Sequence, residues 1–280
     1  MKPFPERTRR GATAVYRHPV LVRLTHWLNA LCLLVLLLSG LQILNAHPAF
    51  YWGEVARFAH PWAAVEAVPR DDGELRGRVT VAGASLDTTG VLGASLSGGE
   101  QLQARAFPSW LTLPSYPDLG AGRRWHFAFA WILVINGVVY GALAVLSGRV
   151  TRLIWPSLAE LRTVPRSLRD HLRLRFAHGD EARGYNVLQK LAYAVVIFGL
   201  LPLMLLTGLT MSPAVYARLP LLGDLLGGRQ SARTLHFLAA SGLVGFFAVH
   251  IAMVLAAGPV NEVRSMITGW FVIRRQKVKP

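Results

Sequence analysis

Four of the nine histidines lie inside long apolar stretches of the sequence, namely His26, His126, His236 and His250. Ionisable side chains are costly at membrane depth, so they indicate functional groups that have partners. The alternative for each one alone is a hydrogen-bonded polar residue in a helical interior. A neutral imidazole is also a good ligand for a transition metal, and a haem iron accepts one on each face.

The spacing of these histidines predicts two pairs. His236 and His250 are fourteen residues apart, so on one helix they fall within about 40° of one face and about 21 Å apart along the axis. Helices that cross a membrane in alternate directions then bring His126 to the depth of His236, and His26 to the depth of His250. We therefore expect two haem irons, the outer one held by His126 and His236 and the inner one by His26 and His250.

Three glycines lie at matching depths on the same faces. Gly40 follows His26 by fourteen residues and would lie at the depth of the outer pair. Gly137 and Gly141 have a similar relation to His126 at the inner depth. We expect these glycines to leave room for a porphyrin. The alternative is plain contact between helices, because glycine is common in membrane helices.

Arginines stand close to three of the histidines: Arg23, Arg123, Arg124 and Arg233. Haem propionates are anionic and face the aqueous edges of a membrane protein, so cationic side chains are expected beside them. The alternative is that these long side chains end a membrane helix and extend to the water.

Four apolar segments must position these residues. They cover about 24–44, 125–146, 188–210 and 235–257, and about 20 apolar residues suffice to cross a bilayer. The predicted fold is an all-α integral membrane protein, a bundle of four transmembrane helices. The first segment follows a basic leader, but it is longer than the apolar part of an ordinary signal peptide and no convincing cleavage site follows. We therefore expect a retained anchor.

The distribution of charge predicts the orientation in the membrane. The 280 residues include 30 Lys and Arg against 15 Asp and Glu, a formal charge of +15. Segments 1–23, 148–186 and 258–280 together hold 19 of the basic residues and 6 of the acidic ones. Because basic residues gather on the cytoplasmic side, we expect both termini and the 148–186 loop in the cytoplasm. The long 45–122 loop would be periplasmic.

Composition excludes several classes of protein. With 52% hydrophobic and only 16% charged residues, the chain resembles neither a basic nucleic-acid-binding protein nor a soluble enzyme. The single Cys32 excludes an intramolecular disulfide, a cysteine-rich iron–sulfur or zinc site, and haem attachment through a C-x-x-C-H motif. Cys32 lies in an apolar run, where we expect it to act as a small buried hydrophobic residue.

The 45–122 loop contains two recognisable segments. Alternating residues at 76–81 indicate a short strand or hairpin. The aromatic and proline-rich segment 107–116 is predicted to form an interfacial lid on the bundle. Two interpretations of this lid stay open: it packs on its own chain, or it docks a partner.

A resemblance to a known family rests on the starts of three predicted spans and on one histidine pair. These are RLTHW at 23–27, GRRWH at 122–126, YNVLQK at 185–190, and His236 with His250. Together they resemble the bacterial di-haem cytochrome b family, which supplies membrane subunits of Ni-Fe hydrogenases, formate dehydrogenases and thiosulfate reductases. Segments 45–48, 107–114 and 264–269 are most similar to the thiosulfate reductase cytochrome b branch. The long first outer loop departs from the compact hydrogenase and formate dehydrogenase subunits.

The resemblance covers nearly the whole chain and implies one membrane cytochrome b domain over residues 1–280, with two haem b groups. It also implies a quinone site beside the inner haem, near the cytoplasmic start of the third span. Asn186 and Gln189 would there contact a quinone carbonyl, with Tyr185 and Lys190 nearby. The alternative is that these residues cap and anchor the helix.

The leading hypothesis is therefore an electron-transfer subunit of the bacterial cytoplasmic (inner) membrane. It would contact membrane lipid, the quinone pool and a periplasmic redox subunit, which is expected to contain molybdenum. That partner would convert the substrate, and this chain is expected to have no catalytic residue and to bind no nucleic acid.

Two alternatives stay open. The first is a self-sufficient haem b oxidoreductase that passes electrons from a small periplasmic donor such as superoxide to quinone. The second is a haem-free metal-ion transporter, which predicts acidic residues within the spans. The four predicted spans contain none.

Overall fold

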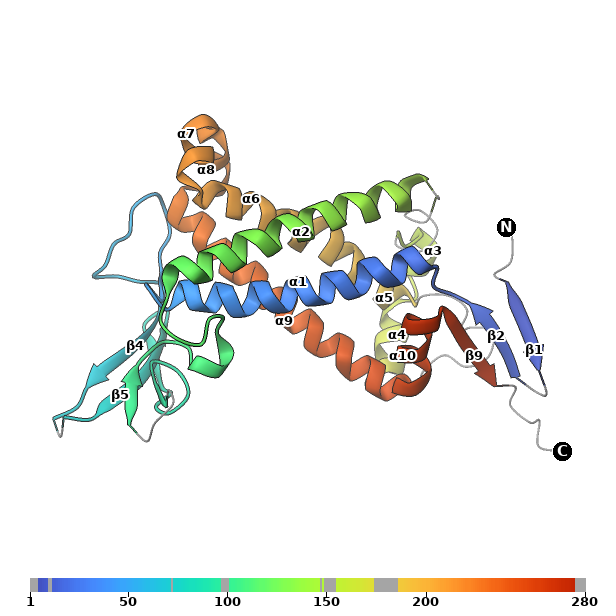
Figure 1. Cartoon of the computed structure of the whole chain (residues 1–280), viewed down its shortest axis with the longest axis horizontal. Helices are drawn as coiled ribbons and strands as arrows, with labels where there is room; N and C mark the ends of the chain where they lie inside the picture. Colours follow the sequence, from blue (N-terminus) through green and yellow to red (C-terminus); the bar gives the residue numbers. More distant parts are fainter. Residues whose placement is uncertain are drawn as a thin grey trace. The chain divides into compact units, whose positions relative to one another are not determined.

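Four apolar helices long enough to cross a membrane dominate the chain. The computed structural model describes residues 5–9, 12–71, 73–96, 101–146, 148, 155–173 and 186–274. Among them, the long helices are α1 (Val20–Leu44), α2 (Leu119–Leu146), a third helix (Val187–Met211) and α9 (Arg229–Ala257), as Figure 1 shows. The prediction of four long apolar helices is confirmed. Each helix begins before the apolar segment expected from the sequence, at Val20, Leu119, Val187 and Arg229.

The third long helix changes its hydrogen-bonding pattern along its length. It consists of α5 (Val187–Ala194), a π-helical segment (Val195–Leu200) and α6 (Leu201–Met211). Pro202 follows the π-helical segment directly. A proline cannot donate a backbone hydrogen bond and its ring clashes with the carbonyl four residues earlier, so the wider turn gives this proline room.

The chain divides into two compact units. One consists of Met1–Leu28, Asn136–Leu201 and Ser241–Pro280, and is called unit 1; the other consists of Asn29–Ile135 and Pro202–Ala240, and is called unit 2. Each long helix therefore contributes one part to each unit. His26 and His250 belong to unit 1, whereas His126 and His236 belong to unit 2.

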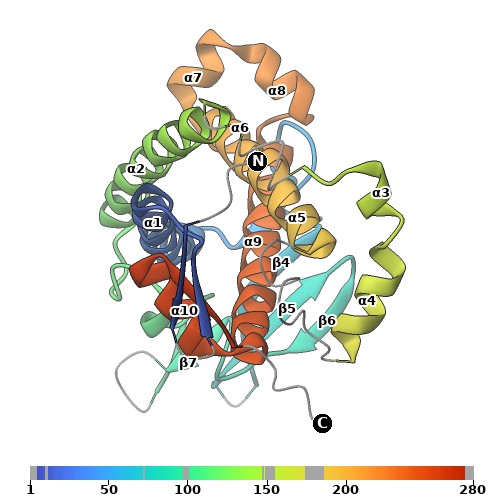
Figure 2. The same cartoon turned by 90° about the vertical axis from the view of Figure 1, so that its right-hand side faces the viewer.

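Unit 1 contains a three-stranded antiparallel sheet that joins the two terminal regions. Its strands have the order β1 (Glu6–Arg9), β2 (Ala12–Tyr16), β9 (Trp270–Arg274). Strand β9 directly follows the short helix α10 (Pro259–Thr268), which is labelled in Figure 2. The expectation of an all-α protein left this sheet out. It is stabilised across the strands, because Tyr16 and Trp270 pack with ring centroids 5.2 Å apart and the Arg7 guanidinium lies over the Trp270 ring. Unit 1 also contains α3 (Leu158–Leu161) and α4 (Val164–Leu172).

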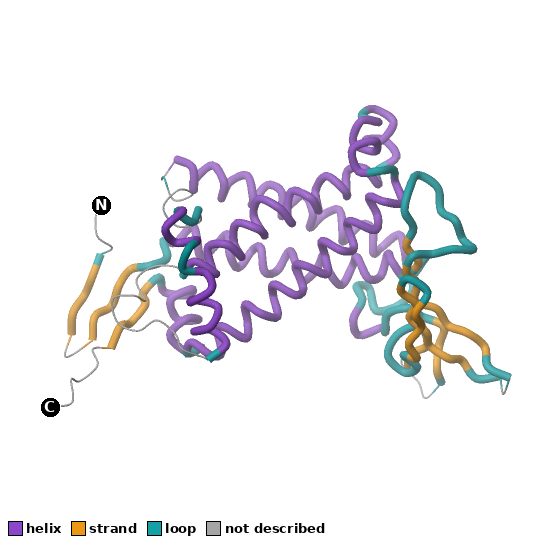
Figure 3. Tube along the Cα trace, turned by 180° about the vertical axis from the view of Figure 1, so that it is seen from behind, coloured by secondary structure: helices purple, strands orange, loops and turns teal. Residues whose placement is uncertain are grey.

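Unit 2 contains the strands of the first long loop, drawn in orange in Figure 3 together with those of the terminal sheet. A four-stranded sheet has the order β3 (Ala49–Phe50), β4 (Ala63–Pro69), β5 (Leu75–Val81), β6 (Ala84–Asp87), and a two-stranded sheet pairs β7 (Ala94–Leu96) with β8 (Leu102–Ala104). The strand predicted at 76–81 is confirmed by β5. Two short helices, α7 (Pro213–Arg218) and α8 (Pro220–Leu226), precede α9.

The aromatic and proline-rich segment after β8 packs against the end of α1. Arg105 is buried and donates hydrogen bonds to Gln42 Oε1 (2.9 Å), to Thr112 Oγ1 (2.6 Å) and to the carbonyl of Ser115 (2.7 Å). The Leu113 amide donates to the carbonyl of Leu38 in α1 (3.1 Å). These contacts match the interpretation in which the segment packs on its own chain.

Candidate functional site

The structure brings His126 of α2 and His236 of α9 together in unit 2. Their ring centroids are 6.3 Å apart and their planes are inclined by 57°. In unit 1, His26 of α1 and His250 of α9 form a second pair with nearly the same geometry, 6.4 Å and 54°. The two pairs are called the outer pair and the inner pair below.

The spacing of both pairs fits one iron between two imidazoles. Two metal–nitrogen bonds of about 2 Å, with about 1 Å from each nitrogen to its ring centre, give a centroid separation of about 6 Å. The described residues contain no group of three or more His, Cys, Asp and Glu that could hold a metal ion. A haem iron needs only two protein ligands, because the porphyrin supplies the other four. The donor set and its spacing therefore fit a haem.

Two buried hydroxyl groups orient the outer pair. Ser39 Oγ lies 3.1 Å from His126 Nδ1, and Thr207 Oγ1 lies 2.9 Å from His236 Nδ1. Ser39 donates its own proton to the carbonyl of Val35 (2.6 Å), and Thr207 donates its proton to the carbonyl of Leu203 (2.6 Å). Because a hydroxyl has one proton, both imidazoles must donate theirs from Nδ1. Nε2 of each ring then keeps a free lone pair, which is the form that binds a metal.

Glycines lie against the same two rings. A Cβ atom placed on Gly40 would meet His126 Cε1 at 3.3 Å, and one placed on Gly208 would meet His236 Cε1 at 3.5 Å. Gly40 had been expected to make room for a porphyrin at the depth of the outer pair. Its nearest neighbour from another helix is the imidazole of His126, the proposed ligand at that depth. Gly40 therefore allows the close approach of a histidine ring.

The first turns of α9 are fixed by the segment that follows α1. Thr234 Oγ1 donates to the carbonyl of Tyr51 (2.7 Å), and Arg233 donates to the carbonyl of His47. The carboxylate of Glu54 accepts the backbone amide of Arg229 (3.0 Å), which is a favourable place for an acid at a helix N-terminus. These bonds set the height of His236, which lies one turn or less beyond Arg233 and Thr234.

The start of α2 sets the height of His126 in a similar way. Asp118 Oδ1 accepts the backbone amide of Ala121 (2.8 Å), so this aspartate caps the helix. One turn before His126, a Cβ on Gly122 would lie 3.0 Å from Cγ of Gln42. The absence of a side chain at Gly122 lets α2 approach α1 closely at this level.

Different contacts surround the inner pair. Asn136 Nδ2 donates to the carbonyl of Thr25 (2.9 Å), the residue before His26, and both Asn136 and Thr25 are buried. The ring of His250 stacks on Phe246, with centroids 5.8 Å apart and an angle of 18°. Nδ1 of His26 is buried and has no hydrogen-bond partner among the described residues.

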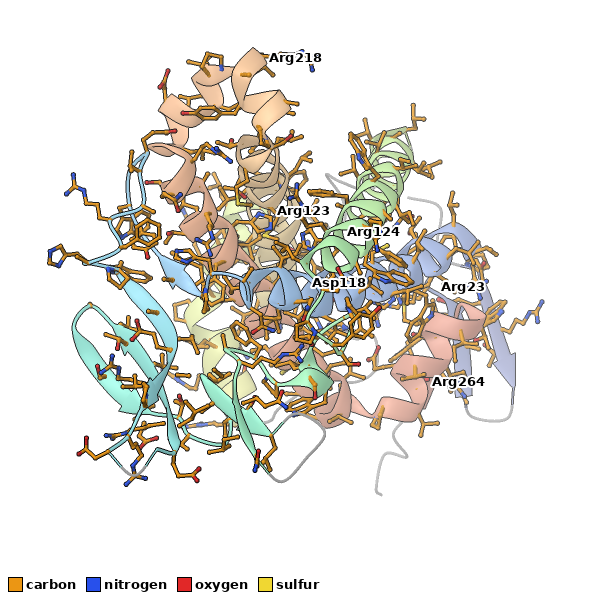
Figure 4. All side chains as sticks on the ribbon, turned by 60° about the vertical axis from the view of Figure 1, so that its left-hand side comes forward. Arg23, Asp118, Arg123, Arg124, Arg218 and Arg264 are labelled. Atoms are coloured by element: carbon orange, nitrogen blue, oxygen red, sulfur yellow. The ribbon has the colours of Figure 1, made fainter. Side chains whose placement is uncertain are left out.

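The arginines expected near the haems occupy three different environments. Arg23 donates to the carbonyl of Ile267 in the last turn of α10, and Figure 4 shows it at the start of α1. Arg123 and Arg124 are exposed in the first turns of α2, where Arg123 lies over the ring of Phe127 at 5.7 Å. Arg233 is partly buried and lies over Phe50 at 5.7 Å. Arg23 and Arg233 are the two that bind backbone carbonyls close to a histidine pair.

Gly137 and Gly141 lie in open space. A Cβ added at either position would have no atom of another part of the described chain within 4 Å. These glycines therefore do not mediate close contact with a neighbouring helix among the described residues.

Asn186 and Gln189 form the N-terminal cap of α5. Asn186 Oδ1 accepts the amide of Leu188 (2.9 Å) and the hydroxyl of Ser167 (2.6 Å), while Gln189 Oε1 accepts the amide of Asn186 (3.0 Å). Such a capping box satisfies backbone amides that have no partner inside the helix. Capping of the helix is the alternative to quinone binding for both residues. It uses only their side-chain carbonyl oxygens. Tyr185 lies outside the described residues.

An ion pair lies next to this cap. Lys190 is buried and donates to Glu160 of α3 at 2.5 Å. This bond and those from Ser157 hold the pKa of the Glu160 carboxyl below its usual value. The pair links α3 to the first turn of α5.

Sequence reasoning missed Ser39, Thr207 and Gly208. Their signal is a hydroxyl residue followed directly by glycine, in the first span and in the third, but the same pattern also occurs in the fourth span at Ser241 and Gly242, where the glycine faces Leu200. In an apolar helix a serine or threonine also bonds to its own backbone, so the pattern becomes informative only when the facing histidine is known.

Comparison with known proteins identifies the family. The model of the family described as prokaryotic cytochrome b561 matches residues 17–68 and 88–269, a range that includes all four paired histidines. An Azospira oryzae protein named "Putative protein-methionine-sulfoxide reductase subunit YedZ1" is 30% identical over 237 residues, which cover 85% of this chain and 89% of that protein. Neither match specifies the thiosulfate reductase branch. The chain belongs to the prokaryotic cytochrome b561 family and is a multi-pass haem protein of the bacterial inner membrane.

Proposed function

We propose that the chain is a di-haem electron conduit between the quinone pool and a periplasmic oxidoreductase. The observation that carries the proposal is the repeated geometry of the two imidazole pairs, 6.3 Å in one unit and 6.4 Å in the other. His126 and His236 would hold the outer haem b, and His26 and His250 the inner one. Bound haem supplies a one-electron carrier.

The chain's own residues hold and orient these carriers. Ser39 and Thr207 face Nδ1 of each outer imidazole, so that Nε2 would be the nitrogen available to bind the iron. Arg23 and Arg233, the partly buried arginines near the pairs, would neutralise propionates, and Arg124 would do so from the exposed start of α2. Gly137 lies in open space, which suits an expected role beside a porphyrin.

The proposed architecture is one membrane domain over residues 1–280, a four-helix bundle with both termini and the 148–186 loop in the cytoplasm. The distribution of basic residues supports this orientation. The 45–122 loop and the outer pair would then face the periplasm, and the inner pair would face the cytoplasmic side. Electrons would cross the membrane from one pair to the other.

Quinone would bind near the cytoplasmic start of the third helix. Asn186 and Gln189 use their carbonyl oxygens to cap α5. A quinone carbonyl accepts hydrogen bonds, so it would meet the amide NH2 groups instead. Capping and quinone binding are therefore compatible roles for the same two side chains.

The named relative supports a periplasmic partner. Its name describes a subunit of a protein-methionine-sulfoxide reductase, which favours the conduit over the self-sufficient oxidoreductase. We propose that the partner contains molybdenum and reduces an oxidised substrate such as protein methionine sulfoxide. Electrons would then flow from quinol through the inner haem and the outer haem to that partner.

Haem content and its dependence on the histidines test this function. The purified chain is expected to contain two b-type haems, and His126→Ala is expected to lower the ratio to one haem by removing the outer one. His60→Ala is the matched control, because His60 is exposed in the first loop, and it should keep both haems. A wild-type chain without haem would overturn the proposal, and two haems in the His126→Ala variant would overturn the pairing.

A second measurement distinguishes conduit from self-sufficient enzyme. Under anaerobic conditions, quinol should reduce the haems of the wild-type chain, and the reduced state should persist until an electron acceptor is added. A periplasmic methionine sulfoxide reductase with its oxidised substrate should reoxidise the haems. Rapid reduction of the oxidised haems by superoxide, with quinone as the final acceptor, would instead favour the self-sufficient oxidoreductase.

A further inference from the structure

The outer pair is held by the same two-residue device on two different helices. Ser39 and Gly40 of α1 face His126, whereas Thr207 and Gly208 of α6 face His236. In each case the hydroxyl meets Nδ1 of the ring and the glycine faces Cε1 of that same ring. Both helices carry this device in the same local sequence, Leu-Leu-Ser-Gly-Leu at 37–41 and Leu-Leu-Thr-Gly-Leu at 205–209. This repetition indicates a specific requirement of the imidazoles.

Both hydroxyls are fully buried, with 0% of either side chain exposed. Each donates its only proton to a carbonyl of its own helix, so its oxygen is left to accept the Nδ1 proton of the imidazole. Water has no access to compete for that proton. The tautomer of both outer histidines is thereby fixed.

Among the residues that the structure describes, the inner pair has no such hydroxyl and glycine against its rings. Nδ1 of His26 is buried without a hydrogen-bond partner among the described residues, and His250 stacks on Phe246. The two pairs therefore share their spacing and differ in what holds the rings. Any property that depends on the Nδ1 hydrogen bond must then differ between the two haems.

Building on the proposed haem ligation by His126 and His236, we infer that Ser39 and Thr207 are positioning residues that lower the reduction potential of the outer haem. A ring that donates a hydrogen bond from Nδ1 is a stronger electron donor through Nε2. Stronger donation stabilises ferric iron relative to ferrous iron. Reduction adds one electron to the iron, and the Nδ1 proton stays on the ring.

Redox titration of the purified di-haem chain tests the role of the hydroxyls. Thr207→Val and Ser39→Ala remove the hydroxyl that faces Nδ1 with little change in shape. They leave in place the carbonyls of Leu36 and Met204, which also accept hydrogen bonds from His126 and His236. Each should shift the midpoint potential of the outer haem upward and leave that of the inner haem unchanged. Thr207→Ser and Ser39→Thr keep a hydroxyl and should retain the wild-type potential. Removing a group that hydrogen-bonds to a metal ligand typically lowers metal affinity by about 10- to 100-fold. Partial loss of the outer haem is therefore also expected in Thr207→Val and Ser39→Ala.

Thr210→Val provides a matched control. Thr210 is on the same helix as Thr207, is equally buried, and donates to the carbonyl of Leu206 (2.8 Å) without contacting a histidine. It should leave both potentials and the haem content unchanged. Ferric EPR spectra of each variant report the outer ligand field independently of the titration.

Three results would overturn the inference. The first is that Thr207→Val and Ser39→Ala both leave the midpoint potential and the EPR signal of the outer haem at wild-type values. The second is that Thr210→Val causes the same shift in potential or the same haem loss as Thr207→Val. The third is that Thr207→Ser does not retain the wild-type potential. The absence of haem from the wild-type chain is a different outcome, because it would contradict the proposed function itself.

Discussion

Gly40 and Gly208 allow their helices to approach the outer imidazoles closely, because neither residue has a side chain. The added Cβ would lie 3.3 Å from His126 Cε1 at Gly40 and 3.5 Å from His236 Cε1 at Gly208. The first distance is tighter than an ordinary van der Waals contact, and the second is an ordinary one. Alanine should therefore be tolerated at Gly208, whereas a longer side chain must displace the ring.

Gly208→Leu is expected to reduce the haem content of the purified chain from two toward one. Its γ and δ carbons would occupy the position of the His236 imidazole, so the outer pair could no longer close on an iron. The ratio of haem to protein measures this loss, and circular dichroism checks that the helices persist.

Gly245→Leu is the control for this substitution. A Cβ at Gly245 meets no other part of the described chain within 4 Å, and nine residues separate it from His236, which puts it on the opposite face of α9. It should keep two haems. Equal haem loss in both variants would contradict a steric role for Gly208.

The sequence allowed the histidine pairs to be named, but not the groups that hold them. Depth along four apolar helices is enough to match His126 with His236 and His26 with His250, and their role as iron ligands stays a prediction. Ser39 and Thr207 could not be identified in the same way. A hydroxyl in an apolar helix meets its own backbone first, and only the packing of α1 and α6 shows which ring its oxygen also faces.

At the scale of secondary structure, the beginning of the third helix combines a cap with a proposed quinone contact. Asn186 Oδ1 and Gln189 Oε1 satisfy backbone amides at the start of α5. Ser167 of α4 adds a hydrogen bond to Asn186, and Glu160 of α3 binds Lys190. The short helices α3 and α4, which both belong to the 148–186 loop, thus fix the first turn of α5.

Two substitutions at Asn186 separate capping from quinone binding. Aspartate is as good a cap as asparagine but has no NH2 group, so Asn186→Asp should keep thermal stability and slow the reduction of the haems by quinol. Asn186→Ala removes both functions and should also lower the free energy of unfolding by about 1 kcal/mol. Stopped-flow reduction and thermal unfolding in detergent measure the two effects. Wild-type reduction kinetics in Asn186→Asp would show that the side chain only caps the helix.

The long helices were easier to predict than the strands. About 20 uninterrupted apolar residues define a membrane helix without reference to the rest of the chain. The terminal sheet depends on pairing between residues 12–16 and 270–274, which are separated by almost the whole sequence. Single strands of four or five residues give no comparable local signal. The π-helical segment was missed because the wide turn before Pro202 follows from one residue in an otherwise regular apolar run.

At the scale of the whole molecule, charge and cysteine content make the topology testable. The basic residues are concentrated in the terminal segments and the 148–186 loop, which predicts that these regions are cytoplasmic. Cys32 is the only cysteine and has 0% of its surface exposed. The unmodified chain should therefore give no background with a membrane-impermeant maleimide.

Two variants, each with one added cysteine beside the buried Cys32, identify the opposite sides of the membrane. Ser85 is exposed in the β5–β6 hairpin and Ala159 is exposed in α3. Ser85→Cys should react with the maleimide in intact spheroplasts, whereas Ala159→Cys should react only in inverted vesicles, because the proposed topology puts them on opposite sides. Both variants should react after detergent solubilisation, which controls for accessibility of each thiol. The reverse pattern would invert the protein in the membrane and move the outer pair to the cytoplasmic side, where a periplasmic partner could not reach it.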